Sequence, residues 1–273
     1  MSRQYYYFGE LGFFNIEILG ALAHYFKLHP DEVLEVTTFK DYACILELLF
    51  IGNIKTHIYD KEFINSPNNR SGHRSYLDQS FDRLRVKNLM IISKHNDLNK
   101  YSIDEFSAGP RCSNLVKPRL FYLDKPIQYH DTNLVDKNIV CICPRYRSHF
   151  SGKNILSDEW DIVYNKIKEH NKDAKIVALG KKQEMLSLTY PDIIYPKDIY
   201  EHIYYMNNCD YGVFPDSGMA EFALNCACKT VKVIYKKQFY STFNRKGEPK
   251  PLLHGFNPFN CNVQKIESLG ELL

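Results

Sequence analysis

The chain has 273 residues, 44% of them hydrophobic and 25% charged, which is typical of a globular protein with room for two domains of modest size. Its net charge of +3, from 35 basic and 32 acidic residues, is too small to indicate nucleic-acid binding by itself. No apolar run approaches the roughly 18 residues that a membrane-spanning helix needs. The amino terminus has the pattern of a strand rather than a leader peptide. We therefore expect a cytoplasmic protein without a membrane anchor.

Strand and helix patterns alternate in the amino-terminal part of the chain. Aromatic and β-branched runs predict strands, and apolar residues at helical spacing predict helices. The expected strands are residues 4–8, 33–38 and 54–59, and the expected helices are residues 16–28, ended by His29-Pro30, and residues 41–50. This rhythm favours a parallel sheet with crossover helices.

The middle of the chain contains loops and a linker. Residues 62–80 are polar, and such a stretch inside a compact domain is often functional. A possible strand follows at residues 89–92, and Lys125-Pro126 begins a linker that ends near Asn138. We place one α/β domain in residues 1–130 and a second in residues 131–273.

A second alternation follows the linker. Its expected strands are residues 139–143, 175–179, 193–195, 211–214 and 230–235, and its expected helices are residues 158–170 with Ser157 as N-cap, 183–188, 199–207, 219–227 and 263–273. The last of these expected helices can pack back on the first domain. The pattern predicts two Rossmann-like domains facing each other across a cleft, where ligands usually bind.

Eight cysteines are spread along the chain, including the pairs Cys141/Cys143 and Cys226/Cys228. Most lie in apolar segments, which is typical of reduced thiols in a cytosolic protein. Zinc sites favour C-x-x-C spacing, so we expect these pairs to pack in the core and to bind no metal.

Three strands of the second half end in residues suited to phosphate binding. The ends of parallel strands meet at one edge of a sheet, so groups distant in sequence converge there. Arginine and lysine bind phosphate oxygens, and a helix amino terminus offers backbone N–H groups and a positive dipole end. The residues are Arg145, Arg147 and Lys153 after the first strand, Gly180 and Lys181 after the next, and Asp216, Ser217 and Gly218 before the helix at 219–227.

Each of these groups also fits a purely structural role. The basic loop residues fit a solvated surface, and Asp216 or Ser217 fits a helix cap worth about 1 kcal/mol. Glu221 fits a first-turn acid favoured by the helix dipole. Because such groups follow three successive strands, their combination favours a ligand site over these structural roles.

The stretch DSGMAEFA, residues 216–223, followed by a helix and then Lys229-Thr230-Val231, resembles the donor-binding element of GT-B glycosyltransferases. It is also similar to the corresponding element of heptosyltransferases and of non-hydrolysing sugar-nucleotide 2-epimerases. Heptosyltransferases usually have a histidine where this chain has Ala220 or Glu221, which makes them the less favoured subfamily. The resemblance implies that the diphosphate meets Ser217 and Gly218, that Glu221 takes the ribose, and that the donor site includes Asp216 and Met219.

The stretch from Phe8 to Phe14 resembles the first strand and loop of GT-B amino-terminal domains, which face the acceptor. Small size and a composition rich in Tyr, Asn and Lys look like glycosyltransferases encoded by large DNA viruses of algae. We expect Glu10 on this loop to be the general base, although it also fits a surface acid. The acceptor-side residues expected with it are Gly9, Gly12, His73 and Asp78.

We therefore expect a metal-independent, inverting glycosyltransferase that moves a hexose or pentose from a UDP- or GDP-linked donor to a glycan or glycoprotein. The sequence has no convincing D-x-D metal-binding pair. Arg145 and Lys181 would stabilise the departing diphosphate, and no cofactor is expected beyond the donor substrate. The alternatives are a sugar-nucleotide 2-epimerase and a non-catalytic protein that binds nucleotide sugars or glycans.

Overall fold

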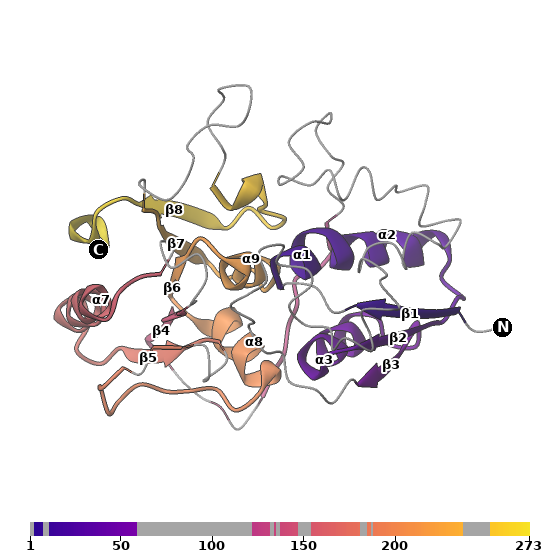
Figure 1. The fold of residues 1–273 in the computed structure, drawn as a ribbon, viewed down its shortest axis with the longest axis horizontal. Helices are drawn as coiled ribbons and strands as arrows, with labels where there is room; N and C mark the ends of the chain where they lie inside the picture. Colours follow the sequence, from indigo (N-terminus) through magenta and orange to yellow (C-terminus); the bar gives the residue numbers. More distant parts are fainter. Residues whose placement is uncertain are drawn as a thin grey trace, which may run out of the picture. The chain divides into compact units, whose positions relative to one another are not determined.

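The computed structural model describes residues 3–7, 11–58, 122–131, 134, 137–146, 154–180, 185–186, 188–236 and 252–273. The chain divides into two compact units, Met1–Lys125 and Pro126–Leu273. Each unit contains one parallel sheet (Figure 1).

The first unit has a three-stranded parallel sheet in the order β1-β2-β3. A helical run connects the first two strands, and one helix connects the second to the third. The strands are β1 (Arg3–Tyr7), β2 (Leu34–Thr38) and β3 (Ile54–Ile58), and the helical segments are α1 (Leu11–Phe13), η1 (Phe14–Ile18), α2 (Leu19–Leu28) and α3 (Lys40–Leu49). The predicted strand–helix rhythm is confirmed. Gly12 lies inside α1 and not in a loop, because the helix begins earlier than its apolar spacing indicated.

Apolar spacing explains the core of the first unit. On α3, Tyr42, Ala43, Ile45 and Leu46 are buried, which is the spacing of one helix face. On β2, Leu34 and Val36 are buried and share one face of the sheet. Helix α2 ends at Leu28, followed by His29 as predicted, and the His29 N–H still donates to the Tyr25 carbonyl.

The second unit has a five-stranded parallel sheet in the order β5-β4-β6-β7-β8. The strands are β4 (Ile139–Ile142), β5 (Lys175–Ala178), β6 (Tyr211–Pro215), β7 (Thr230–Ile234) and β8 (Asn262–Ile266), and the helical segments are α7 (Ser157–His170), α8 (Ile199–Asn208), α9 (Gly218–Asn225), η6 (Leu252–Gly255) and η7 (Leu269–Glu271). Every residue of β4 is buried, as expected of a central parallel strand covered on both faces.

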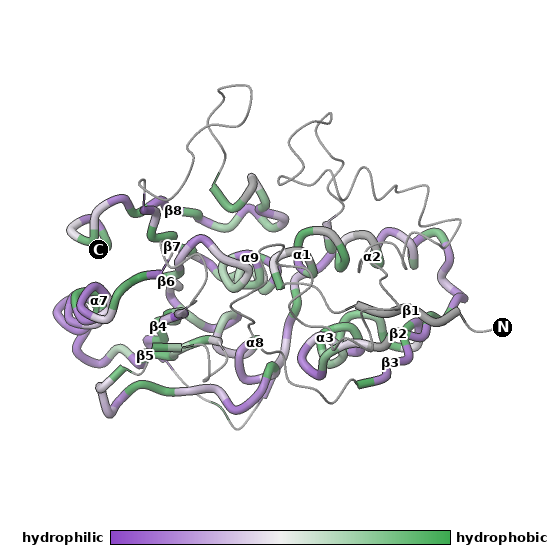
Figure 2. Tube along the Cα trace, in the orientation of Figure 1, coloured by the Kyte–Doolittle hydropathy of each residue, from purple (hydrophilic) through white to green (hydrophobic). Residues whose placement is uncertain are grey.

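The core of the second unit lies between the sheet and α7. Trp160, Val163 and Ile167 of α7 pack against Val140, Ile142 and Ile176 of the sheet. The opposite face of the helix is polar, and Figure 2 shows hydrophilic residues along much of α7. This division predicts that α7 is held to the sheet mainly by burial of its apolar face.

Four predictions about the secondary structure of the second unit are wrong. The expected strand at 193–195 is a single parallel bridge between Ile194 and Val177. Met185, expected in a helix at 183–188, instead forms an antiparallel bridge with Arg145. Residues 263–273, expected to be a helix, form β8 and η7, because pairing with β7 overrides their helical spacing. Ser157 is the first residue of α7 rather than its N-cap, and the Glu159 carboxylate accepts the Leu156 N–H at 2.6 Å.

The start of the second unit is anchored to its helices. The Ile127 N–H donates to the Asn225 carbonyl at 2.8 Å. The Asn207 amide donates to the carbonyls of Ile127 and Cys226 at 2.9 and 2.7 Å and accepts the Tyr129 N–H at 3.1 Å. Part of the predicted linker is therefore packed structure, with Ile127 fully buried.

Two predicted features, the polar stretch 62–80 and the strand at 89–92, lie outside the described residues. In the ranges that the structure does describe, none of the helices is both long and apolar enough to span a membrane.

Candidate functional site

The strand order of the second unit reverses between β4 and β6. From β4 the chain moves to β5 on one side and then returns to β6 on the other. Ligands of open α/β sheets bind beyond the carboxyl ends of the strands at such a reversal. Arg145 follows β4, and the turn from Asp216 to Gly218 spans the end of β6 and the start of α9.

The predicted convergence at one sheet edge is present in the described residues. Ile142 of β4 pairs in parallel with Ala178 of β5 and Val213 of β6. The ends of these three strands therefore lie at the same edge. They bring Arg145, Gly180 and the Asp216–Gly218 turn to that edge from distant parts of the sequence.

Ser217 is at the N-cap position of α9 with an extended backbone, φ −157° and ψ 164°. Its carbonyl accepts the N–H groups of Ala220 and Glu221 at 3.0 and 3.2 Å. Ser217 is thus the N-cap residue that the structural alternative named, but its hydroxyl makes no capping hydrogen bond.

Ser217 is only 7% exposed, and its Oγ has no hydrogen-bond partner among the described residues. A buried hydroxyl without a partner costs about 1–3 kcal/mol, so most are hydrogen-bonded. This one lies at the head of a helix, where the first N–H groups and the positive dipole end favour an anion. The arrangement suits a ligand that accepts a hydrogen bond from Oγ.

The other predicted residues of this turn are close by in the chain and differ in exposure. Glu221, in the first turn of α9, is only 4% exposed. Asp216, Gly218 and Met219 are half-buried. Asp216, Gly218 and Glu221 already have interaction partners, so their part in ligand binding would add to contacts that they make in the folded chain.

Backbone contacts hold Arg145 and join the segment after β4 to Leu186. The Arg145 N–H donates to the Cys143 carbonyl at 2.7 Å, and the Leu186 N–H donates to the Pro144 carbonyl at 2.8 Å. Arg145 bridges Met185, whose side chain lies 3.6 Å from the position that a Cβ on Gly180 would take. Gly180 has φ +132°, a backbone conformation that residues other than glycine rarely adopt.

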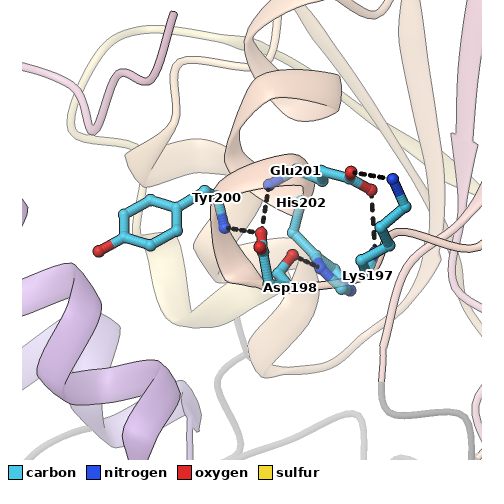
Figure 3. Close-up of polar contacts among 5 residues, drawn as sticks. All are labelled: Lys197, Asp198, Tyr200, Glu201 and His202. Carbon is cyan, nitrogen blue, oxygen red and sulfur yellow. Dashed lines mark hydrogen bonds and ion pairs between the residues drawn. The ribbon is translucent and has the colours of Figure 1, made fainter. Parts of the chain in front are cut away.

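The Gly180 N–H is engaged within the fold. It donates to Nε2 of His202 on α8 at 3.1 Å, so this N–H points to a side chain and not to a ligand. The His202 Nδ1 lies 2.6 Å from the Asp198 carbonyl (Figure 3). His202 was not among the predicted site residues, because no local pattern in the sequence links α8 to the end of β5.

Lys236 is a further basic residue at the edge, since it follows β7. Its ammonium contacts the Glu159 carboxylate at 2.5 Å and the Asn154 carbonyl at 3.0 Å. These contacts tie the start of α7 to the sheet and give Lys236 a structural role.

Seven of the predicted site residues lie outside the described residues, so their placement stays a prediction: Gly9, Glu10, His73, Asp78, Arg147, Lys153 and Lys181. Gly12 is described and is half-buried in α1.

Three buried thiols lie close together near the amino ends of β6 and β7. Cys209 and Cys228 have their sulfurs 3.3 Å apart, and Cys141 is hydrogen-bonded to Cys209. Hydrogen bonding to Cys141 and burial raise the pKa of Cys209 well above its ordinary value. Across the described ranges, no three His, Cys, Asp or Glu side chains are arranged to hold a metal ion.

No protein-family model matches the sequence, and no curated protein matches it either. Several solved structures are similar in fold. TibC of enterotoxigenic Escherichia coli, a dodecameric iron-containing heptosyltransferase solved with ADP-D-β-D-heptose, has a TM-score of 0.52 at 14% identity; the match covers 96% of this chain and 62% of TibC. This chain thus spans less than two thirds of the length of TibC.

Two other structures match over more of their own length. A family 9 glycosyl transferase of Veillonella parvula has a TM-score of 0.54 at 12% identity, covering 96% of this chain and 86% of the other. The E. coli heptosyltransferase WaaC, solved with ADP, has a TM-score of 0.51 at 11% identity, covering 98% of this chain and 94% of WaaC.

These matches confirm the predicted fold class, which is α/β with two Rossmann-like domains of the GT-B type. The neighbours include heptosyltransferases, the subfamily that the sequence motif favoured less. The resemblance to glycosyltransferases of algal viruses stays a prediction.

Proposed function

We propose that this protein is a metal-independent glycosyltransferase that moves a sugar from a nucleoside diphosphate sugar to a hydroxyl of a glycan or glycoprotein. The observation that carries the proposal is the buried Ser217 hydroxyl, which has no partner among the described residues and lies at the head of α9. The position of this turn at the strand-order reversal supports a ligand site there. The GT-B fold and the ADP-heptose bound by TibC support a nucleotide sugar as that ligand.

The donor diphosphate would bind at the start of α9. Ser217 Oγ would donate to a phosphate oxygen, and the N–H groups of Gly218 and Met219 would face the same charge. Glu221 would accept hydrogen bonds from the ribose hydroxyls, and Asp216 would border the site. The helix dipole favours the anion here, while glycine at the first helical position lets the backbone come close.

The leaving diphosphate needs positive charge as the bond to the sugar breaks. Arg145 would supply it with a guanidinium suited to bidentate contact with phosphate oxygens, helped by Lys181, Arg147 and Lys153. In the transfer step the acceptor oxygen bonds to the anomeric carbon, and the carbon–oxygen bond to the diphosphate breaks with its electron pair leaving on that oxygen. A single displacement of this kind inverts the anomeric centre.

The acceptor hydroxyl must lose its proton during transfer. We assign this proton to the Glu10 carboxylate, with Asp78 and His73 as the next candidates. Gly9 and Gly12 would flank the base on the acceptor side. Cytoplasmic location is part of the same proposal.

The donor nucleotide is the first property to test. The sequence predicts UDP or GDP with a hexose or pentose, and ADP joins the panel because TibC and WaaC were solved with ADP-heptose and ADP. Thermal-shift measurements with ADP-, UDP-, GDP- and CMP-sugars should show stabilisation by at least one. A ligand at 100 times its Kd adds about 2.7 kcal/mol, or roughly 5–10 °C in Tm. A panel without any shift would contradict the proposal.

Catalysis is separated from binding by Glu10→Gln. We expect transfer to fall by a factor of roughly 100 or more while the donor Kd stays within about twofold, because a general base acts only in the reaction step. Unchanged turnover would remove Glu10 as the base. Donor binding without transfer in the wild-type protein would indicate a non-catalytic binding protein instead.

A further inference from the structure

We propose that His202 is a positioning residue for the site, and that it acts as a neutral imidazole protonated on Nδ1. In this form it fixes Gly180 at the end of β5 and, through Met185, the backbone of Arg145. The link to diphosphate binding rests on the function proposed above, whereas the tautomer and the contacts do not.

The partners of His202 determine its protonation state. The Asp198 carbonyl, 2.6 Å from Nδ1, can only accept, so Nδ1 carries a proton. The Gly180 N–H, 3.1 Å from Nε2, can only donate, so Nε2 has a free lone pair. An imidazolium would place a second N–H against the Gly180 N–H. The neutral ring with its proton on Nδ1 is therefore the form that satisfies both contacts.

Helix α8 presents this ring in a fixed orientation. The Asp198 side chain caps the helix by accepting the N–H groups of Tyr200 and Glu201 at 2.9 and 3.0 Å, as Figure 3 shows. The Asp198 carbonyl also accepts the backbone N–H of His202 at 3.2 Å. His202 is only 9% exposed, so the ring has little room to move.

Contacts lead from His202 to Arg145, the cationic residue predicted to bind the phosphate. His202 accepts the Gly180 N–H, and the Met185 side chain lies 3.6 Å from the position that a Cβ on Gly180 would take. Met185 bridges Arg145, whose N–H is bonded to the Cys143 carbonyl. Each step joins residues that the structure describes. A change at His202 is thus transmitted to the backbone that carries the Arg145 guanidinium.

The charged groups around the ring have partners of their own. On its own helix, the Asp198 carboxylate is directed at the helix N–H groups. The Glu201 carboxylate accepts from the Lys197 N–H at 2.9 Å and pairs with the Lys197 ammonium at 3.4 Å. From the β5 side, the described contact with the ring is the Gly180 backbone.

Two variants of similar size test the proposal. His202→Gln retains an amide oxygen that can accept the Gly180 N–H, whereas His202→Leu fills the space without an acceptor. We expect ADP affinity, or that of whichever nucleoside diphosphate binds best, to fall about tenfold in H202L and to stay within about twofold in H202Q. His170→Gln, at an exposed histidine in the last turn of α7, is the matched control and should have no effect.

The comparison of H202Q with H202L separates positioning from general stability, because both variants remove the imidazole and only H202Q keeps an acceptor for the Gly180 N–H. H202Q as weak as H202L would overturn the role of this acceptor.

Nitrogen-15 NMR tests the contacts of His202 with Asp198 and Gly180 in the absence of any ligand. The side chain of His202 should have a protonated Nδ1 and an unprotonated Nε2 at neutral pH, and the amide signals of Gly180 and Arg145 should move in H202L and return in H202Q. A proton on Nε2, or unmoved amides, would refute the positioning claim. If no nucleotide binds to the wild type while these signals behave as expected, the proposed function fails and the positioning claim holds.

Discussion

Ser217→Ala is expected to change folding stability and ligand affinity in opposite directions. In the wild type Ser217 is only 7% exposed, and its hydroxyl has no hydrogen-bond partner in the described part of the chain. Removing it relieves a desolvation cost of about 1–3 kcal/mol, and the small void left behind offsets about 1 kcal/mol of that gain. The free energy of unfolding should therefore stay constant or rise by up to about 2 kcal/mol.

The same substitution should weaken donor binding. A hydrogen bond from Oγ to a charged phosphate contributes about 1.5–3 kcal/mol. Since 1.4 kcal/mol is a factor of ten, the Kd of the nucleoside diphosphate should increase about 10- to 100-fold. Isothermal titration calorimetry measures the affinity, and urea denaturation of the ligand-free protein measures the stability.

Ser268→Ala is the matched control, because the Ser268 hydroxyl is an ordinary cap that accepts the Gly270 N–H at 3.2 Å. This variant should lose about 0.5–1 kcal/mol of stability and keep its affinity. Our reasoning about Ser217 would be refuted if S217A lost stability like S268A, or if its Kd matched that of the wild type.

Three further predictions concern the second unit. Asn207→Ala removes three hydrogen bonds around Ile127, Tyr129 and Cys226 and should lower the free energy of unfolding in urea by about 2–4 kcal/mol; a loss below about 1 kcal/mol would contradict this. Gly212→Ala places a Cβ 2.2 Å from a ring carbon of the fully buried Phe214 and should cost about 2 kcal/mol or more, whereas a wild-type Tm would show that the ring can move. Cys209 and Cys228 should react with Ellman's reagent only on unfolding, even near pH 9, because the pKa of each thiol is raised well above 9.0, that of Cys209 by its hydrogen bond to Cys141 and by burial, and that of Cys228 by its hydrogen bond to Cys209 and by burial. The folded state then retains protons that the unfolded chain loses, so the stability from these thiols is complete below about pH 9 and decreases as pH rises; fast labelling of the folded protein would refute this.

Elements with strong local patterns were predictable from the sequence. The apolar run from Ile139 to Ile142 indicated a buried parallel strand, and it is a central strand of the second sheet. Residues 216–218, predicted from a small-residue turn before a helix, do join β6 to α9. In both places local propensity and tertiary packing favour the same structure.

Features that depend on distant partners were not predictable. Residues 262–266 become a strand because β7 supplies a pairing edge, which their own spacing does not reveal. The bridge between Arg145 and Met185 overrides a helical pattern in the same way. The contact of His202 with Gly180 could not be predicted, because the two residues lie 22 positions apart and no sequence pattern or motif indicates such a hydrogen bond.

The central claim is that a nucleoside diphosphate binds at the start of α9. The most direct measurement is an amide NMR titration of the nitrogen-15-labelled protein with the nucleoside diphosphate that binds best. The account predicts that the largest shifts fall on Ser217, Gly218 and Met219, with Arg145 following, and that S217A reduces them at equal ligand concentration. Saturable binding whose largest shifts lie away from this turn, or no shift with any nucleotide, would contradict it.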